Sequence, residues 1–194
     1  MVAQSAIGLL RQHIRQSDRI HGFVTKGGEA ANVIPAHTSA RYMVRSRTLE
    51  QLDKLFPRVR SCFEAGALAT GCKLSIVGGD KPYADMVHDI ELAALYQRNA
   101  EAVGRQFRTP VGVNLSGHAG STDMGNVSHR MPAIHPIVGI NSLPAVNHQP
   151  EFTAHCATAE ADLAIFDGAL AMVWTAIDAA TQAPVRNRLM SVQR

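Results

Sequence analysis

Three motifs that would complete a catalytic metal centre are missing from this chain. Its 194 residues contain no His-x-Asp, no adjacent pair of glutamates and no His-Glu-x-x-His. A catalytic zinc site takes three protein ligands, and such motifs commonly supply them together with a general base. We therefore expect no metal-dependent catalysis from this chain unless a separate polypeptide supplies the other half of a site.

Cysteines are few, and their spacing is that of neither a disulfide framework nor a zinc site. Cys62, Cys72 and Cys156 are odd in number and include no Cys-x-x-Cys pair. Unpaired thiols persist in reducing compartments, whereas small secreted domains carry even sets of cysteines. The pattern predicts reduced thiols and a cytoplasmic location.

Long apolar runs and a strong charge of either sign are absent as well. No run approaches the roughly 20 residues of a membrane span, and no charged amino-terminal segment leads into an apolar one. Charged residues make up 18% of the chain and the formal net charge is only +3, with the basic side chains scattered. The sequence therefore predicts neither a membrane nor a nucleic-acid partner.

What is present suffices for a packed α/β unit in the first half of the chain. Hydrophobic residues make up 46% of the total, enough for the core of one domain or two small ones. Thr48 with Gln51 is a capping box, and Gly71 is a typical helix end. From periodicity we expect a helix to residue 14, strands at 19–25 and 39–45, a helix from 48 to 71 and a strand at 73–77.

This order of elements is that of a ferredoxin-like α/β sandwich without its first strand. The chain also opens within a helical pattern that has no cap, which is consistent with a missing amino-terminal segment. An incomplete sandwich exposes a strand edge, and such edges template pairing with other chains. We therefore expect self-association.

Past Pro82 the pattern changes to helices and one long loop-rich region. We expect helices at 83–104 and 158–180, a buried strand at 111–114, and loops from 115 to 156. A loop this long inside a compact domain is more often functional than idle. The last helix carries large apolar residues on one face, which we expect to pack in a core: Leu163, Phe166, Leu170, Val173, Trp174 and Ile177.

Five of the nine histidines lie in or next to the loop-rich region, together with Asp123. Imidazoles gathered in this way can build a metal or proton-transfer site. No pair has the i, i+4 spacing of a zinc-binding helix, so each taken singly is better explained as a surface or hydrogen-bonded loop residue. The five are His118, His129, His135, His148 and His155.

A second candidate site joins Asn32, in the stretch Asn-Val-Ile-Pro, to Arg45 at the end of the second strand. An amide donor and a guanidinium on one side of a strand can bind a substrate carboxylate. On spacing alone, a turn asparagine and a solvated edge-strand arginine explain the same residues better.

Taken together, these motifs resemble those of one family and follow one another in the same order along the chain. They are Asn32 to Pro35 followed by Arg45, the Gly-Ser-Thr-Asp-Met-Gly-Asn-Val-Ser run of 120–128, Ile134-His135-Pro136, and Asn147-His148. The family is that of the dinuclear-zinc peptidases and amidohydrolases, which includes the aminoacylases, carboxypeptidase G and the desuccinylases. Residues 121–128 look most like the aminobenzoyl-glutamate hydrolases and related dipeptidases. The resemblance covers residues 1 to 182.

The resemblance implies a two-domain zinc enzyme that hydrolyses amide bonds next to a carboxylate. Residues 1–78 match most of a lid or dimerisation domain, and residues 79–194 match the carboxyl-terminal portion of the catalytic domain. Two zinc ions in each complete site would activate a water molecule, and a glutamate would transfer the proton. Dimerisation through the lid would make the protein a homo-oligomer, and its partner would be a small amide or dipeptide substrate.

Position by position, the resemblance assigns five residues. His148 matches the last metal ligand, Asn32 and Arg45 match lid residues that bind the substrate carboxylate, and Thr122 and Asp123 match a loop that lines the site. The family's other metal ligands and its general-base glutamate have no match here. No catalytic residue is therefore assigned, and we expect this chain alone not to hold zinc stably.

Two other functions remain open from the sequence. One is a non-catalytic dimerisation or small-acid-binding module that keeps the lid without the chemistry. The other is a ferredoxin-like regulatory domain that senses a small acid, which accounts for residues 1–78 and leaves 79–194 unexplained. Manganese or cobalt would suit ligands similar to those of zinc.

Overall fold

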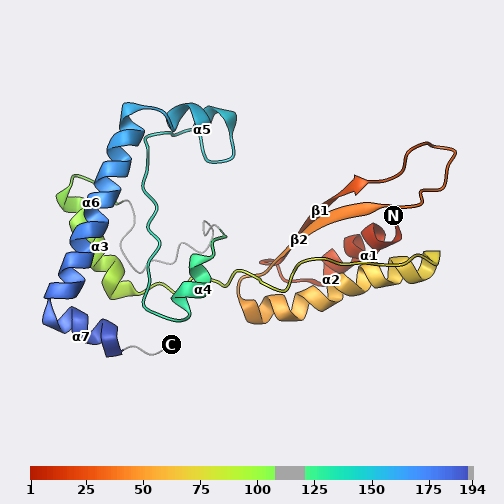
Figure 1. Cartoon of the computed structure of the whole chain (residues 1–194), viewed down its shortest axis with the longest axis horizontal. Coiled ribbons are helices and arrows are strands. Elements are labelled where there is room, and N and C mark those ends of the chain that lie inside the picture. The colour runs from red at the N-terminus through yellow and green to blue at the C-terminus, as the bar shows by residue number, and fades with distance from the viewer. Residues whose placement is uncertain (108–120, 192–194) are drawn as a thin grey trace. The chain divides into compact units, whose positions relative to one another are not determined.

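The computed structural model describes residues 1–107 and 121–191, which form two compact units, Met1–Asp85 (unit 1) and Met86–Arg194 (unit 2) (Figure 1). Each unit is considered by itself. Their assignment as a lid and part of a catalytic domain stays a prediction. The strand expected at 111–114, and with it His118 and Gly120, lies outside the described residues.

Unit 1 packs helices against a two-stranded antiparallel sheet. Its elements are α1 (Val2–Leu10), the 3-10 turn η1 (Arg11–His13), β1 (Arg19–Lys26), β2 (Ser39–Arg45) and α2 (Leu49–Thr70). The pairing runs from Arg19 opposite Arg45 to Lys26 opposite Ser39. The core is made of residues at most 3% exposed: Ile7, Ile20, Leu55 and Val59. The expected opening helix and both strands are confirmed, because their apolar periodicity coincides with this core.

The predicted caps of α2 are also confirmed. The Thr48 side chain accepts a hydrogen bond from the Gln51 N–H at 3.3 Å, and Gly71 ends the helix with φ 66°. The helix continues through Pro57. On its inner side the Phe63 ring meets Tyr42 of β2 edge-on, with centroids 5.0 Å apart.

The strand expected at 73–77 is wrong. Residues 72–79 form neither a strand nor a helix, and the sheet described in unit 1 contains β1 and β2 alone. Apolar alternation becomes a strand only where a neighbour accepts its hydrogen bonds, and the described residues offer none here. The segment instead passes close to α2, since a Cβ on Gly79 would lie 2.7 Å from the Phe56 ring. The mixed helix and sheet content is compatible with an α/β class, and the ferredoxin-like arrangement stays a prediction.

The helices of unit 2 are its longest described elements. The unit contains α3 (Ile90–Ala102), α4 (Met124–Ser128), α5 (Pro150–His155), α6 (Ala159–Thr181) and α7 (Ala183–Ser191). The helix expected from residue 83 begins at residue 90, because Asp89 accepts a hydrogen bond from the Leu92 N–H at 2.9 Å and thereby caps it. Just before it, Val87 N–H donates to the Ser128 hydroxyl at 3.0 Å.

Helix α6 was expected at 158–180 and is confirmed, with Thr158 as its cap. The expected packing face is wrong. The helix turns its small residues inward, namely Ala161, Ala164, Gly168, Ala171 and Thr175. Ala171 is fully buried against Tyr96 and Ala100 of α3. Small side chains let the two helices approach closely, so the bulky residues of α6 are left on its outer side.

By length and apolar composition alone, α6 also qualifies as a candidate membrane span. Core helices of soluble proteins meet the same criteria, so this carries little weight. The described residues contain no other helix that does so.

Candidate functional site

His148 lies at the tip of a tight turn that leads into α5. The turn is closed by the Gln149 side chain, which accepts a hydrogen bond from the Val146 N–H at 3.1 Å. His148 itself has φ 70°, a left-handed conformation in which histidine is more common than most residues. Its side chain is exposed and has no hydrogen bond to any described residue. The imidazole is therefore accessible to a ligand.

A metal ion needs more than this one imidazole. Across residues 1–107 and 121–191, no three His, Cys, Asp or Glu side chains gather closely enough to hold a metal ion. Because a zinc site takes three or four protein ligands, the residues present do not make up a fitting donor set. No chemical step through a metal follows from these residues.

Thr122 and Asp123 stand at the start of α4. The Thr122 hydroxyl accepts a hydrogen bond from Met124 N–H at 3.3 Å, and the Asp123 carbonyl accepts one from Asn126 N–H at 2.9 Å. Asp123 is exposed and makes no side-chain cap, so its carboxylate faces solvent. The fully buried residue of this run is Ser128, whose hydroxyl donates to the Gly125 carbonyl at 2.7 Å. The motif thus folds into one turn anchored at its end.

Asn32 and Arg45 lie at opposite ends of the hairpin in unit 1. Asn32 is exposed in the loop between the strands, and Arg45 is exposed at the far end of β2. Seven residues of strand span about 20 Å at the usual rise. Within one copy of the chain, the structure does not bring these two side chains together. Arg45 forms no ion pair with any described residue.

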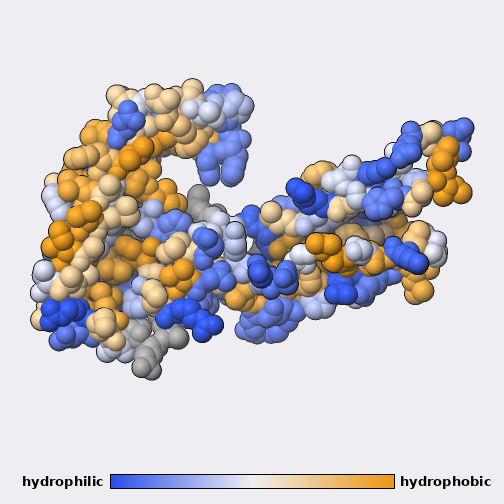
Figure 2. Space-filling view, in the orientation of Figure 1, coloured by the Kyte–Doolittle hydropathy of each residue, from blue (hydrophilic) through white to orange (hydrophobic). Residues whose placement is uncertain are grey.

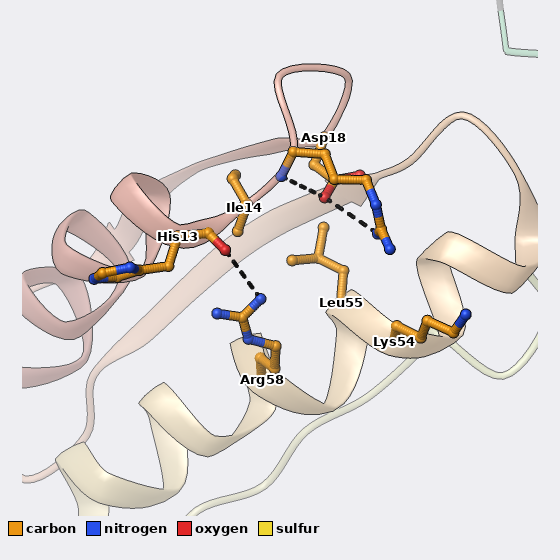
Figure 3. A pocket seen from close by; sticks show the side chains of 7 residues that line it. His13, Ile14, Asp18, Lys54, Leu55 and Arg58 are labelled. Atoms are coloured by element: carbon orange, nitrogen blue, oxygen red, sulfur yellow. Dashed lines mark hydrogen bonds and ion pairs between the residues drawn. The ribbon is translucent and has the colours of Figure 1, made fainter.

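Unit 1 also contains a half-open hollow of about 390 Å³ between η1 and α2 (Figure 3). None of the five predicted site residues lines it. Its walls are His13, Ile14, Arg15, Asp18, Lys54, Leu55 and Arg58. The Arg58 guanidinium donates to the His13 carbonyl at 3.2 Å, and the Arg15 backbone N–H donates to the Asp18 carboxylate at 3.1 Å.

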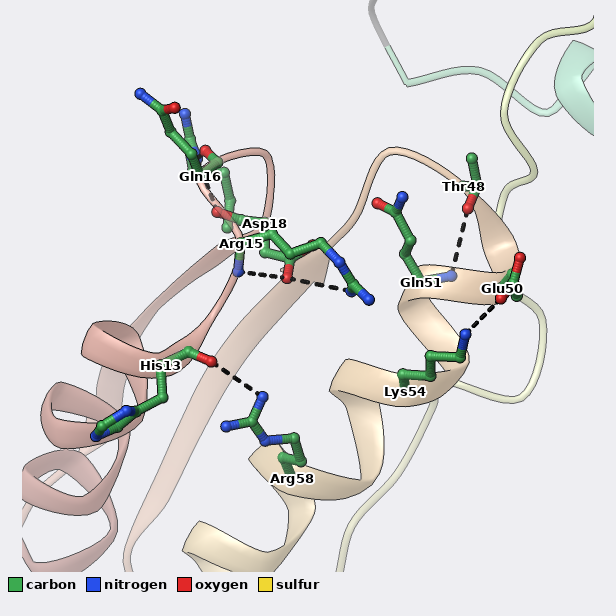
Figure 4. Close-up of polar contacts among 10 residues, drawn as sticks. His13, Arg15, Gln16, Asp18, Thr48, Glu50, Gln51, Lys54 and Arg58 are labelled. Carbon is green, nitrogen blue, oxygen red and sulfur yellow. Dashed lines mark hydrogen bonds and ion pairs between the residues drawn. The ribbon is translucent and has the colours of Figure 1, made fainter.

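The charged groups around this hollow are tied to neighbouring groups in the same unit (Figure 4). Lys54 pairs with Glu50 one turn earlier on α2, and Arg15 lies 3.9 Å from the Asp18 carboxylate, which is almost fully buried. The hydrogen bond of Lys54 also lowers the pKa of the Glu50 carboxyl. Of the contacts around the hollow, the bond from Arg58 to the His13 carbonyl is the one that holds the end of η1 against α2. The charged side chains here are therefore accounted for by local structural contacts.

Unit 2 contains a two-point charged contact that the sequence does not predict. Arg188 of α7 binds Asp89 through two hydrogen bonds of 2.9 and 2.8 Å, and these bonds raise the pKa of the guanidinium. An acid directly before an apolar periodic segment is a helix-start signal that would have identified Asp89. No sequence signal pairs it with an arginine 99 residues later.

Comparison with known proteins finds two similar dipeptidases. Over 178 residues it is 33% identical to the mouse Xaa-Arg dipeptidase and to the human Xaa-Arg dipeptidase. The matched region covers 92% of this chain. No family model matches it.

The match covers only part of these relatives. The chain spans 41% of the length of the mouse enzyme and 40% of the human one. The similarity extends over nearly the whole of this chain. Zinc and the particular subfamily rest on the motif resemblance alone.

Proposed function

We propose that this chain is part of a hydrolase that cleaves dipeptides or related amides next to a free carboxylate. The observation that carries the proposal is the 33% identity to two Xaa-Arg dipeptidases over 92% of the chain. Similarity this extensive is far more specific than any of the short motifs. It includes both compact units, so the relationship is not limited to a single shared module.

The names of the relatives indicate a dipeptide with arginine at its carboxyl end as the first substrate to test. The motif resemblance adds two alternatives, aminobenzoyl-glutamate and N-acyl amino acids. All three have an amide bond beside a free carboxylate. We therefore propose carboxylate recognition as the common requirement.

Arg45 is our main candidate for binding that carboxylate. Its guanidinium is exposed, has no ionic partner in the described part of the chain, and can form two parallel hydrogen bonds to a carboxylate. Asn32 is proposed as a separate amide donor, since the hairpin holds it far from Arg45. Thr122 and Asp123 are proposed to line the site. A dimer through unit 1 remains part of the proposal.

His148 is proposed as the one metal ligand that this chain contributes. The metal proposed is zinc, as the motif resemblance implies. The exposed and unbonded imidazole supports this role, although no three potential ligands gather anywhere among the described residues. We further propose that the chain alone does not turn over substrate, because its sequence has no His-x-Asp and no Glu-Glu pair.

A hybrid enzyme tests this function. In the human relative, the 178 matched residues would be replaced by the corresponding residues of this chain, and hydrolysis of alanyl-arginine would be measured by product chromatography. We expect hydrolysis by the hybrid and none by the chain alone. His148→Ala should abolish hydrolysis, and Arg45→Gln should raise KM by roughly tenfold or more because a charged hydrogen-bonding pair is lost.

Matched controls come from the same elements. His155→Ala alters another histidine of the loop-rich region, and Arg41→Gln alters an exposed arginine earlier on β2. Both should leave the hybrid active. A folded hybrid without activity on any of the three substrate classes would refute the proposed hydrolysis. Full activity in His148→Ala would refute the assigned ligand.

The non-catalytic alternative has one observation in its favour. Arg45 and the exposed hairpin are present in this chain, whereas the other metal ligands and the general-base glutamate that the resemblance implies are not. In that case the chain alone would bind a small acid such as succinate, Arg45→Gln would abolish the binding, and the hybrid would be inactive.

A further inference from the structure

The outer side of α6 is the largest feature of unit 2 that the proposed function leaves unexplained. Seven large apolar side chains on this helix are exposed: Leu163 58%, Ile165 70%, Phe166 64%, Met172 55%, Val173 54%, Trp174 37% and Ile177 53%. In the space-filling view, hydrophobic colour runs along α6 (Figure 2). We call these seven residues the α6 outer face.

An outer face of this kind is unusual for a surface helix. A helix at the surface of a stable domain is apolar on one side and charged on the other, whereas a helix that is apolar all round is normally buried. From residue 163 to residue 177 the only charged residue is Asp167, which is paired with Arg105 at 3.0 Å. The outer face therefore has no charge of its own.

The exposed area is large enough to be an interface. Side chains of this size that are about half exposed leave roughly 100 Å² each, so seven leave on the order of 700 Å². A stable interface buries about 800 Å² on each partner, and exposed apolar patches of several hundred Å² commonly mark binding surfaces.

A lipid bilayer is a poor occupant for this face. The inner side of α6 is fixed to α3 by polar groups, since the Asn99 amide donates to Thr175 at 3.2 Å and to Asp178 at 3.0 Å. Helix α3 also carries Gln97 and Glu101, which are hydrogen-bonded to each other. Membrane insertion of α6 would either break these bonds or take α3 into lipid, and both are costly.

We propose that the α6 outer face docks against polypeptide corresponding to the part of the dipeptidase relatives that this chain does not match. That part is more than half of the relatives' length, because the chain spans 41% and 40% of them. The partner surface is apolar and uncharged, as required by a face without charges. The inference rests on the same homology as the proposed function, and its test does not depend on activity.

The first test uses the chain alone. The double variant Phe166→Gln with Val173→Gln should unfold in urea at the same midpoint as the unaltered chain, within about 0.5 kcal/mol, because exposed side chains without partners contribute little. The matched control Ala171→Gln alters the same helix on its buried side and should lower stability by more than about 2 kcal/mol. Loss of stability in the double variant would mean that the face is already packed, which overturns the proposal.

The second test measures docking by reagent accessibility. Ile165→Cys would be labelled with a maleimide in the chain alone and in the hybrid enzyme, with the site resolved by mass spectrometry. We expect labelling in the hybrid to be at least tenfold slower. Leu68→Cys, an 85% exposed position on α2, should label at similar rates in both proteins. If the hybrid does not fold, mixing the chain with the separately produced unmatched part of the human enzyme gives the same comparison.

The outcomes distinguish docking from the proposed hydrolysis. If the cysteine of Ile165→Cys is protected from the maleimide in the hybrid and the hybrid does not hydrolyse substrate, docking is supported and the proposed hydrolysis is refuted. If the hybrid hydrolyses substrate and this cysteine is not protected, docking alone is refuted. If the chain alone forms a dimer in which this cysteine is protected, and the double variant loses that protection, the α6 outer face binds a second copy of the chain. That result would overturn the proposal. If the chain floats with phosphatidylcholine vesicles, the α6 outer face binds lipid, and the proposal is likewise overturned.

Discussion

Arg188 and Asp89, 99 positions apart, form a two-point salt bridge that fastens α7 to the start of α3. Asp89 is 4% exposed, and one of its carboxylate oxygens also accepts the Leu92 N–H that caps α3. Arg188 in addition pairs with Glu91 at 2.7 Å. One carboxylate therefore serves both a helix cap and a contact between helices. Its burial makes it dependent on the guanidinium, because an uncompensated buried charge is costly.

Arg188→Ala should destabilise unit 2 by about 2–3 kcal/mol. Breaking a buried ion pair costs about 3–5 kcal/mol, and the partial exposure of Arg188 lowers this figure. Arg188→Lys should recover part of the loss, since it keeps the charge without the two-point geometry. Urea unfolding monitored by Trp174 fluorescence measures both. Arg186→Ala, at an exposed position on the same helix, should change stability by less than about 0.5 kcal/mol. If Arg186→Ala lost as much stability as Arg188→Ala, the stabilising role assigned to the Arg188–Asp89 salt bridge would be refuted.

The elements that sequence patterns predicted well are those specified locally. Strand 39–45 pairs with the strand that directly precedes it in the sequence, and the caps Thr48 and Gly71 depend on neighbouring residues; all three are confirmed. The errors arose where distant residues decide. Residues 73–77 lack a neighbouring strand, and α6 faces inward through its small residues because α3 supplies the tyrosine that fills the contact. Periodicity shows which residues share a face, and it does not show what covers that face.

The candidate site could be predicted only as a set of loop positions. The structure places His148 on a turn before α5 and Asp123 before α4, both exposed. Whether such side chains come together in one site depends on the paths of the loops that carry them. These loops have no periodic sequence pattern from which their paths could be predicted. The separation of Asn32 from Arg45, in contrast, follows directly from the antiparallel hairpin and could have been predicted once both strands were recognised.

Thr48→Ala should cost about 1 kcal/mol of unit 1 stability. The Thr48 hydroxyl accepts the Gln51 N–H, and alanine would leave that donor without its cap at the start of a 22-residue helix. Thr48→Ser keeps the acceptor and should cost only a few tenths of a kcal/mol. Chemical unfolding of both variants measures the difference, and equal stabilities would show that the cap contributes nothing.

Cys62 should react with thiol reagents at least about tenfold more slowly than Cys72 and Cys156. Burial raises the pKa of the Cys62 thiol, the nearby charge of Arg58 opposes this only in part, and the thiolate is the reactive form. Cys72 and Cys156 are exposed. Alkylation at pH 8 followed by peptide mass spectrometry would rank the three rates. In denaturant the rates should converge, and equal rates in the native protein would contradict the prediction.

Tyr96 should make unit 2 less stable in strongly alkaline solution. Burial between α3 and α6 raises the pKa of its phenol, an effect that Arg105 opposes more weakly. The folded state therefore favours the protonated phenol. The contribution of this phenol to stability is fully present below the ordinary tyrosine pKa of about 10 and is lost as the pH rises through the higher pKa of the folded protein.

Urea midpoints between pH 8 and pH 11 should fall more steeply in the unaltered chain than in Tyr96→Phe. Tyr83→Phe removes an exposed phenol and controls for lysine titration. If Tyr96→Phe and Tyr83→Phe show the same slope, the buried phenol does not govern the alkaline loss of stability.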